Sequence, residues 1–268
     1  MVKISIEKLE IFARHGVYDF EKENGQNFYI DLDFYTNDIL QDDILQTVNY
    51  ATVVEKIKEF FTKKSYDLIE FCCNDLSVYL LKQFDKIVKL DLTVSKPNAP
   101  IVDIFSNIST SISRGWHKVY IATGSNLGDK ENYILTAINE IKHNDNFRFI
   151  KQSTLISTKP YGVTDQPDFI NGAICVDTLL SPNELLTYLQ SLEKKANRVK
   201  LRKWGERTLD LDILMYDNLV MFTPDLKIPH PEMHIRDFVL TPLKEIEPYL
   251  VHPIKNKSVT ELLNDLQK

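Results

Sequence analysis

The chain has 268 residues, with 32 lysines and arginines against 38 aspartates and glutamates, so its formal net charge is −6. Hydrophobic residues make up 43% and charged residues 26%, a composition that excludes a disordered or collagen-like chain. No run of about 18 apolar residues occurs, so we expect no membrane span.

The N-terminus and the cysteines bear on cellular location. Residues 1–12 interleave lysine and glutamate with apolar side chains, whereas a signal peptide needs an unbroken apolar core. Three cysteines, two of them adjacent, make no disulfide framework. We therefore expect a cytoplasmic protein with reduced thiols.

Residues 1–115 show an α+β pattern. Apolar residues alternate in two early segments and again after residue 86, as in strands, while the segments between them repeat with a helical period. The order strand, strand, helix, helix, strand, strand favours a mostly antiparallel sheet with helices on it. The expected strands are residues 2–13, 27–36, 87–95 and 101–112, and the expected helices are residues 50–64, capped by Asn49, and 68–84.

A small, polar segment, residues 109–117, lies between two strand-like runs and predicts a domain boundary near residue 115. The second piece, residues 116–268, is also long enough for a core of its own. Its pattern predicts an α/β sandwich with helices on the sheet. The expected strands are residues 119–123, 147–157, 170–177 and 209–216, and the expected helices are residues 129–142, 182–200, 235–246 and 258–267.

Two carboxylates on one predicted strand are the sharpest feature of the second piece. Asp210 and Asp212 are two residues apart, so they point to the same face of a strand, while Leu211 points to the other. Side by side they repel each other unless a cation lies between them. A hard Mg²⁺ ion held by carboxylates and phosphate oxygens fits this pattern. An exposed strand face with ordinary acids is the alternative.

A basic cluster precedes this pair. Residues 194–207 contain seven lysines and arginines and a single acid, Glu206. One arginine can bind two phosphate oxygens at once, and lysine acts as a point charge. The cluster therefore favours a nucleoside polyphosphate. A solvated helix end is the alternative. Because the chain as a whole is acidic, nucleic acid is disfavoured. The glycine-bounded segment 124–128 lacks the full phosphate-loop pattern and is interpreted as a strand-to-helix turn.

Four motifs in the second piece closely resemble 6-hydroxymethyl-7,8-dihydropterin pyrophosphokinase: ATGSNLGD, DQPDFINGA, RKWGERTLDLDIL and IPHPEMHIRDFVLTPL. The resemblance covers about residues 118–262. It implies a ferredoxin-like α/β sandwich, two Mg²⁺ ions, and transfer of the β,γ-pyrophosphate of ATP to a pterin with release of AMP.

The same resemblance implies roles for individual residues. Asp210 and Asp212 would hold the metal ions, with Arg198 and Arg207 as further catalytic residues. The residues implied for ATP are Arg198, Lys200, Arg207, Ile213, His230 and Arg236. Those implied for the pterin are Thr158, Tyr161, Phe169, Asn171, Trp204 and Phe238. Lys200 stands where the family often has arginine, and Lys159 where some relatives have proline.

Spacing says less about the first piece. Lys96 lies at a predicted strand end before a proline, where a lysine is commonly just solvated. The pair His15-Gly16 fits a simple turn. Tyr50 and Glu70 each begin a predicted helix, where packing and the helix dipole explain them.

Taken together, however, the first piece resembles dihydroneopterin aldolase through ARHGVYDFEKENGQNFYIDLDF, TVNYATV, DLIEFCCNDL and LTVSKPNAPI. The resemblance covers residues 2–113 and implies an antiparallel, tunnelling-fold-like domain that needs no cofactor. It implies Lys96 as general acid and base, Glu21 facing the substrate side chain, and Ile69 and Glu70 on the pterin. Tyr50 would come from a neighbouring subunit. Because residues 1–115 contain His15 as their only histidine, a zinc site is disfavoured.

The sequence thus predicts a bifunctional, homo-oligomeric enzyme of folate synthesis that acts on pterins and ATP, without nucleic acid or membrane as a partner. Two alternatives remain open. The first piece could be an inactive scaffold, or the chain could be a nucleotide- or RNA-binding module that uses the basic cluster. The balance of aldol cleavage and side-chain epimerisation is open as well.

Overall fold

The computed structural model describes residues 1–37, 41–162, 164–198 and 205–267. The chain divides into two compact units, Met1–Trp116 and His117–Lys268. None of the helices that the structure describes has the length and apolar content needed to cross a membrane. All three cysteines are free and buried.

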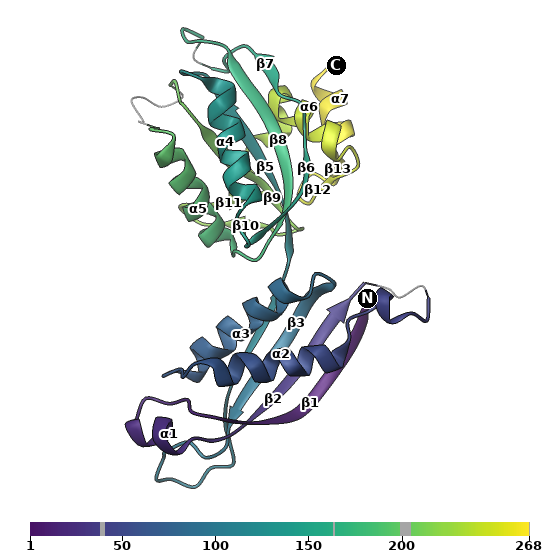
Figure 1. Cartoon of the computed structure of the whole chain (residues 1–268). Coiled ribbons are helices and arrows are strands. Elements are labelled where there is room, and N and C mark those ends of the chain that lie inside the picture. Colours follow the sequence, from purple (N-terminus) through teal and green to yellow (C-terminus); the bar gives the residue numbers. More distant parts are fainter. Residues whose placement is uncertain (38–40, 163, 199–204, 268) are drawn as a thin grey trace. The chain divides into compact units, whose positions relative to one another are not determined.

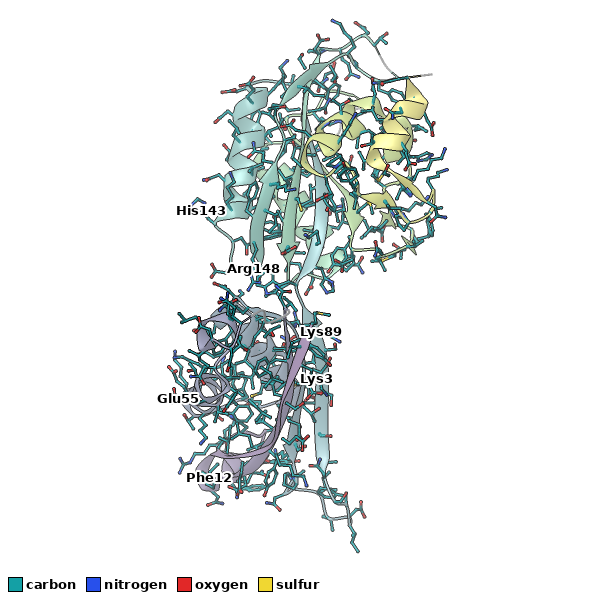
Figure 2. The ribbon with its side chains drawn as sticks, turned by 90° about the vertical axis from the view of Figure 1, so that its right-hand side faces the viewer. Lys3, Phe12, Glu55, Lys89, His143 and Arg148 are labelled. Carbon is teal, nitrogen blue, oxygen red and sulfur yellow. The ribbon has the colours of Figure 1, made fainter. Side chains whose placement is uncertain are left out.

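The first unit is a four-stranded antiparallel sheet, in the order β1-β2-β3-β4, with two long helices on one face (Figure 1). Figure 2 shows the two layers side-on, with Lys3 and Lys89 on the sheet side and Glu55 on the helix side. The elements are β1 (Val2–Ala13), α1 (Asp19–Asn24), β2 (Gln26–Thr36), the short 3-10 helix η1 (Ile44–Gln46), α2 (Tyr50–Lys63), α3 (Ile69–Gln83), β3 (Ile87–Lys96) and β4 (Ile108–Gly115).

The core of this unit follows from the two periodicities in the sequence. Alternate residues of β2 are buried, among them Phe28 and Phe34, because they point at the helices. Helix α2 begins where the Asn49 side chain accepts the Ala51 N–H at 2.9 Å, and it buries a stripe at helical spacing that includes Ile57. Sheet and helices therefore share one apolar layer, and the predicted α+β fold is confirmed.

The second unit has helices on both faces of its main antiparallel sheet, β6-β8-β5-β9, with β7 also paired to β8 (Figure 1). Helices α4 and α5 cover one face, and α6 and α7 cover the other. The elements are β5 (His117–Ser125), α4 (Lys130–Lys142), β6 (Phe147–Gln152), β7 (Ile156–Thr158), β8 (Phe169–Thr178), α5 (Pro182–Lys195), β9 (Asp210–Tyr216), β10 (Met221–Phe222), β11 (Lys227–Ile228), η2 (Met233–Ile235), α6 (Asp237–Ile246), β12 (Val251–His252), β13 (Lys257–Ser258) and α7 (Val259–Leu266).

Two predicted strands differ from the structure. The strand expected over residues 101–112 is wrong in its first part, because β4 begins only at Ile108. Pro100 directly precedes this stretch, and Val102 and Ile104, whose apolar character suggested a strand, are fully exposed. The strand expected over residues 147–157 is split into β6 and β7. Helix α1 was not predicted, because six residues are too few for a periodic signal.

Candidate functional sites

The two aspartates of β9 lie on the face of the sheet that carries α6 and α7. Asp210 pairs in register with Gly124 of β5, and Asp212 pairs with Ala122. Leu211, between them, is buried among the apolar side chains of the opposite face, as its position in the strand predicts. The negative charge of Asp210, followed by partial burial, raises the pKa of Asp212 to about 7. The two carboxylates therefore repel each other in the way the sequence suggested.

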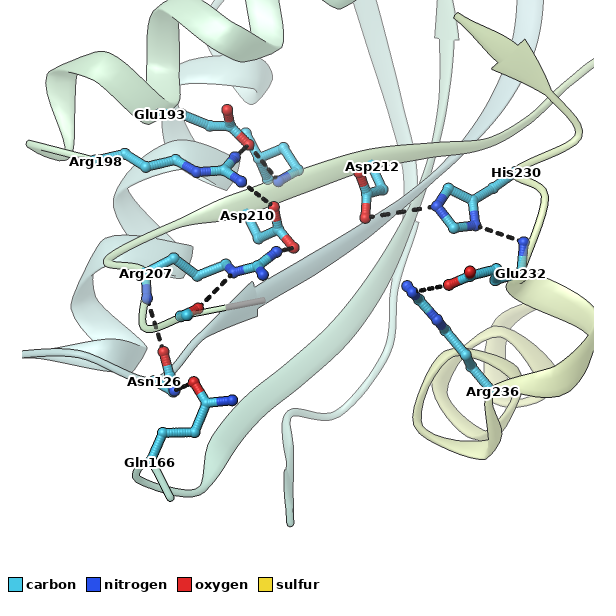
Figure 3. Close-up of polar contacts among 12 residues, drawn as sticks. Asn126, Gln166, Glu193, Arg198, Arg207, Asp210, Asp212, His230, Glu232 and Arg236 are labelled. Carbon is cyan, nitrogen blue, oxygen red and sulfur yellow. Dashed lines mark hydrogen bonds and ion pairs between the residues drawn. The ribbon is translucent and has the colours of Figure 1, made fainter. Parts of the chain in front are cut away.

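Asp210 makes two ion pairs (Figure 3). Its Oδ1 lies 2.8 Å from a terminal nitrogen of Arg198, and its Oδ2 lies 2.5 Å from one of Arg207. Arg198 follows the end of α5 and Arg207 precedes β9, so two segments of the basic cluster meet on one acid. The three side chains are only about one-fifth exposed, which strengthens the electrostatic attraction between them.

Glu193, which the sequence analysis missed, completes this group. It lies on the buried face of α5, four residues after Leu189, where a helix facing the core rarely carries an acid. Its carboxylate accepts the Leu211 N–H at 2.9 Å and pairs with Arg198. Burial raises the pKa of Glu193. An acid at a core-facing helical position was the signal that could have revealed it.

His230 faces the second aspartate (Figure 3). Its Nδ1 accepts the Glu232 N–H at 3.3 Å, and its Nε2 lies 4.0 Å from an Asp212 carboxylate oxygen. Burial, followed by the charge of Arg236, lowers the pKa of His230 to about 4. The imidazole is therefore neutral near pH 7, and with Nδ1 accepting, its proton lies on Nε2, toward Asp212.

A pocket that is partly open to solvent adjoins Asp210. In it the Asn171 Nδ2 donates to Thr158 Oγ1 at 2.7 Å, which fixes the orientation of the amide. The rings of Tyr161 and Phe238 lie 6.0 Å apart, with the Arg236 guanidinium 5.7 Å from each. The structure brings these predicted residues into one pocket lining: Thr158, Tyr161, Phe169, Asn171, Arg207, Asp210, Arg236 and Phe238.

The glycine-bounded turn after β5 anchors the segment before the aspartates. Buried Asn126 accepts the Arg207 N–H at 2.8 Å and returns its own N–H to the Arg207 carbonyl at 3.0 Å. Its Nδ2 donates to Gln166 at 3.1 Å, so one amide joins two loops of the site (Figure 3). Asn126 is a second residue whose role the sequence analysis missed, because spacing indicated only a turn there.

The donor set fits magnesium bound together with a polyphosphate. Among the described residues, no group of three or more His, Cys, Asp and Glu could hold a metal ion. Asp210 and Asp212 nevertheless offer oxygen ligands on one face, and the charge of Asp210 raises the pKa of Asp212, a repulsion that a cation between them would relieve. Mg²⁺ commonly takes one or two carboxylates and completes its shell with phosphate oxygens and water.

In the first unit, a buried ion pair joins residues far apart in sequence. The Lys96 Nζ lies 2.5 Å from Glu21 Oε1, and both side chains are less than one-tenth exposed. The second carboxylate oxygen accepts the Tyr18 N–H at 3.1 Å. Lys96 ends β3 and Glu21 lies in the first turn of α1, so the short helix that was not predicted presents this carboxylate.

Gly16 makes room for this pair. A Cβ on Gly16 would lie 2.3 Å from the Glu21 carboxyl carbon, and its φ of +151° disfavours a side chain. Beside it, the buried His15 ring accepts the Tyr66 N–H at 3.2 Å on Nδ1. Burial, followed by the charge of Lys96, lowers the pKa of His15 to about 4. His15 thus supports the loop as a neutral ring.

The start of α3 lies beside this loop, and Tyr50 does not. Tyr66, three residues before α3, accepts the Gly16 N–H on its carbonyl at 2.8 Å, so the segment that leads into Ile69 and Glu70 is joined to this loop. Phe61, near the end of α2, packs on His15 with ring centroids 5.0 Å apart. Tyr50 begins the same helix, about 16 Å earlier along its axis. Its side chain is exposed at the opposite end of this helix.

Three predicted residues need separate mention. Lys200 and Trp204 lie outside the described residues. Ile213 is buried in the core on the face of β9 opposite the aspartates, so any contact with a nucleotide would come from its backbone.

Comparison with known families matches each unit to a different one. Residues 120–248 match the family described as 7,8-dihydro-6-hydroxymethylpterin-pyrophosphokinase. Residues 4–113 match the family described as dihydroneopterin aldolase. The two matches lie within the second and the first unit, respectively.

Individual relatives are similar to one unit or to nearly the whole chain. The 2-amino-4-hydroxy-6-hydroxymethyldihydropteridine pyrophosphokinase of Haemophilus influenzae is 44% identical over 144 residues, which cover 54% of this chain and 89% of that protein. The folic acid synthesis protein fol1 of Schizosaccharomyces pombe is 31% identical over 280 residues, which cover 98% of this chain but 37% of that longer protein. Among solved structures, E. coli dihydroneopterin aldolase in complex with neopterin has a TM-score of 0.40 and 26% identity, over 43% of this chain and all of that one.

Proposed function

Because the chain belongs to the 7,8-dihydro-6-hydroxymethylpterin-pyrophosphokinase family and carries a dihydroneopterin aldolase domain before it, we propose that it catalyses two successive steps of folate synthesis. The first unit would cleave 7,8-dihydroneopterin to glycolaldehyde and 6-hydroxymethyl-7,8-dihydropterin. The second unit would transfer pyrophosphate from ATP to the hydroxymethyl group of that product.

The first step needs a proton carrier beside a pterin. A base takes the proton of a side-chain hydroxyl, the adjacent C–C bond breaks, and its electron pair is delocalised into the ring until an acid protonates the carbon. We assign this proton transfer to Lys96, whose Nζ touches the Glu21 carboxylate. Ile69 and Glu70 would hold the amino-pyrimidine edge, since the first turn of a helix offers free N–H groups and Glu70 offers a carboxylate.

The second step needs position and charge more than a nucleophilic side chain. The hydroxymethyl oxygen attacks the β-phosphorus of ATP and loses its proton, the bond from that phosphorus to the α-phosphate oxygen breaks, and AMP leaves. Asp210 and Asp212 would hold two Mg²⁺ ions, which neutralise phosphate charge when bound. Arg198, Arg207 and Arg236 would bind the phosphates.

One observation carries the proposal. The pocket that adjoins Asp210 is lined by an oriented amide, Asn171, and by two aromatic side chains, Phe169 and Phe238. A flat heterocycle needs aromatic faces and an amide for its ring edge. A site for a phosphate-bound metal next to such a pocket suits a pterin that accepts a phosphoryl group.

A single assay tests both activities. The purified chain is incubated with 7,8-dihydroneopterin, ATP and Mg²⁺, and the products are separated by chromatography. We expect glycolaldehyde, AMP and the pterin pyrophosphate to form together. AMP that appears only when hydroxymethyldihydropterin is supplied would make the first unit an inactive scaffold, and no AMP in either case would contradict the proposal for the second unit.

We further propose that the first site is completed by a second copy of the chain. Tyr50 lies about three helical turns from the end of α2 that packs beside the Lys96 site, so it cannot serve the site of its own protomer. The exposed apolar residues Ile101, Val102 and Ile104 after β3 also favour contact with another copy. Homo-oligomerisation would unite Tyr50 of one protomer with Lys96 of another.

Mixing two inactive variants tests this arrangement. We expect Tyr50→Phe and Lys96→Ala each to lose most glycolaldehyde release, and co-expressed chains to recover part of it, because some sites in mixed oligomers take both native residues. The measurement is glycolaldehyde release by the co-purified mixture, with its mass determined by light scattering. A strict monomer, or a mixture no more active than its parts, would contradict a shared site.

A further inference from the structure

The arginines that would bind phosphate are already engaged by Asp210. Arg198 and Arg207 each direct a terminal guanidinium nitrogen at a different oxygen of this carboxylate, at 2.8 Å and 2.5 Å (Figure 3). A phosphate oxygen would accept hydrogen bonds from these same N–H groups. One acid therefore occupies donors on both arginines and also supplies the oxygens proposed for the metal.

The positive and negative side chains around Asp210 are equal in number. Arg198 also pairs with Glu193, so two arginines face two carboxylates in a setting where each side chain is at most one-quarter exposed. A triphosphate that arrives alone must compete with Asp210 for the arginines, and a cation that arrives alone must compete with the arginines for Asp210. Together, the two ligands replace both sets of contacts at once.

We propose that Asp210 acts as a lock on the free nucleotide site, holding Arg198 and Arg207 until a cation takes the carboxylate and the phosphates take the arginines in a single exchange. This inference rests on the proposed function and deepens it. The site thereby selects the metal–nucleotide complex over either component. Because such coupling is reciprocal, nucleotide strengthens cation binding by the same factor.

The lock predicts an unusual result for Asp210→Asn. Loss of the acid removes a metal ligand, but it also releases both arginines. We therefore expect the variant to bind metal-free nucleotide about tenfold more tightly than the native chain does, within the usual range of coupling factors. Loss of any negative charge near the triphosphate would by itself raise the affinity of the protein for it. A control variant that removes a neighbouring negative charge is therefore needed.

Asp212→Asn is that control. With the titration run at about pH 8.5, above the pKa of Asp212, it removes the same charge two residues away on the same face of β9, and the side chain that Asp212 faces is the neutral His230, at 4.0 Å, rather than an arginine. Isothermal titration calorimetry would measure binding of an ATP analogue with a methylene group between its α- and β-phosphorus, in EDTA, to the native chain and both variants. Asp210→Ser serves as a second variant in which the two arginines are released from the carboxylate. Thermal melting shows that each variant is folded.

An affinity for the metal-free analogue that rises about tenfold in Asp210→Asn or Asp210→Ser, and at most about threefold in Asp212→Asn, would support the lock. Equal gains in all variants, or no gain, would overturn it and leave the proposed function standing, provided that the native chain binds the analogue with Mg²⁺. If the native chain binds the analogue in neither condition, the proposed function of the second unit fails and the lock fails with it.

Discussion

Replacement of Lys96 by alanine is expected to lower the rate of glycolaldehyde release by about 10²–10⁴-fold, the usual contribution of a positioned proton carrier. The reason is local: Lys96 is the lysine in contact with Glu21, and both side chains are less than one-tenth exposed. AMP formation from supplied hydroxymethyldihydropterin should be unchanged, because we assign that reaction to the other unit. The measurement is the initial rate of each reaction.

Two controls protect this result from a folding artefact. Lys89→Ala removes an exposed lysine from the same strand, on the face without helices, and should retain both activities (Figure 2). Loss of Lys96 also leaves the Glu21 carboxylate buried without its partner, which costs about 3–5 kcal/mol of stability. Lys96→Met combined with Glu21→Gln avoids that charge and should be equally inactive. Undiminished glycolaldehyde release in either variant would remove Lys96 from the mechanism.

The double change Asp210→Asn and Asp212→Asn should abolish AMP formation, with a loss of about 10³-fold or more, because phosphoryl transfer depends on neutralised phosphate charge. Glycolaldehyde release by the first unit should persist. The measurement is AMP produced from ATP and hydroxymethyldihydropterin at saturating Mg²⁺.

Asp225→Asn is the matched control, since Asp225 is an exposed acid in the turn between β10 and β11. The double variant also separates an enzyme from a binding module. A nucleotide- or RNA-binding module that uses residues 194–207 would keep its ligand and show no acid-dependent turnover. Retained AMP formation would refute a catalytic role for the two aspartates.

Much of the fold could be predicted because it depends on local patterns. The alternation in β2 and the helical stripe of α2 each report which side of an element faces the core. The same rule placed Asp210 and Asp212 on one face of β9. Periodicity succeeds at these positions because burial of apolar area, the dominant driving force, acts on each element separately.

Contacts between distant segments could not be predicted in this way. The resemblance implied roles for Glu21 and Lys96, but no spacing rule could join them, since they are brought together by α1, too short to leave a periodic signal. Glu193 was missed because its partners, Arg198 and the Leu211 N–H, come from other segments. The apolar residues after β3 were interpreted as a strand, because sequence alone cannot tell burial inside a chain from exposure at its surface.

The position of Tyr50, at the end of α2 opposite the Phe61–His15 contact, has a consequence for the rate of the first reaction in a cell. If assembly supplies the missing side chain, the first reaction becomes sensitive to how much of the chain a cell makes, since scarce protomers seldom meet. The second reaction, as proposed, would need no such encounter. At low expression the rate of the first reaction would fall more than the capacity for the second. The supply of hydroxymethyldihydropterin would then limit the second reaction.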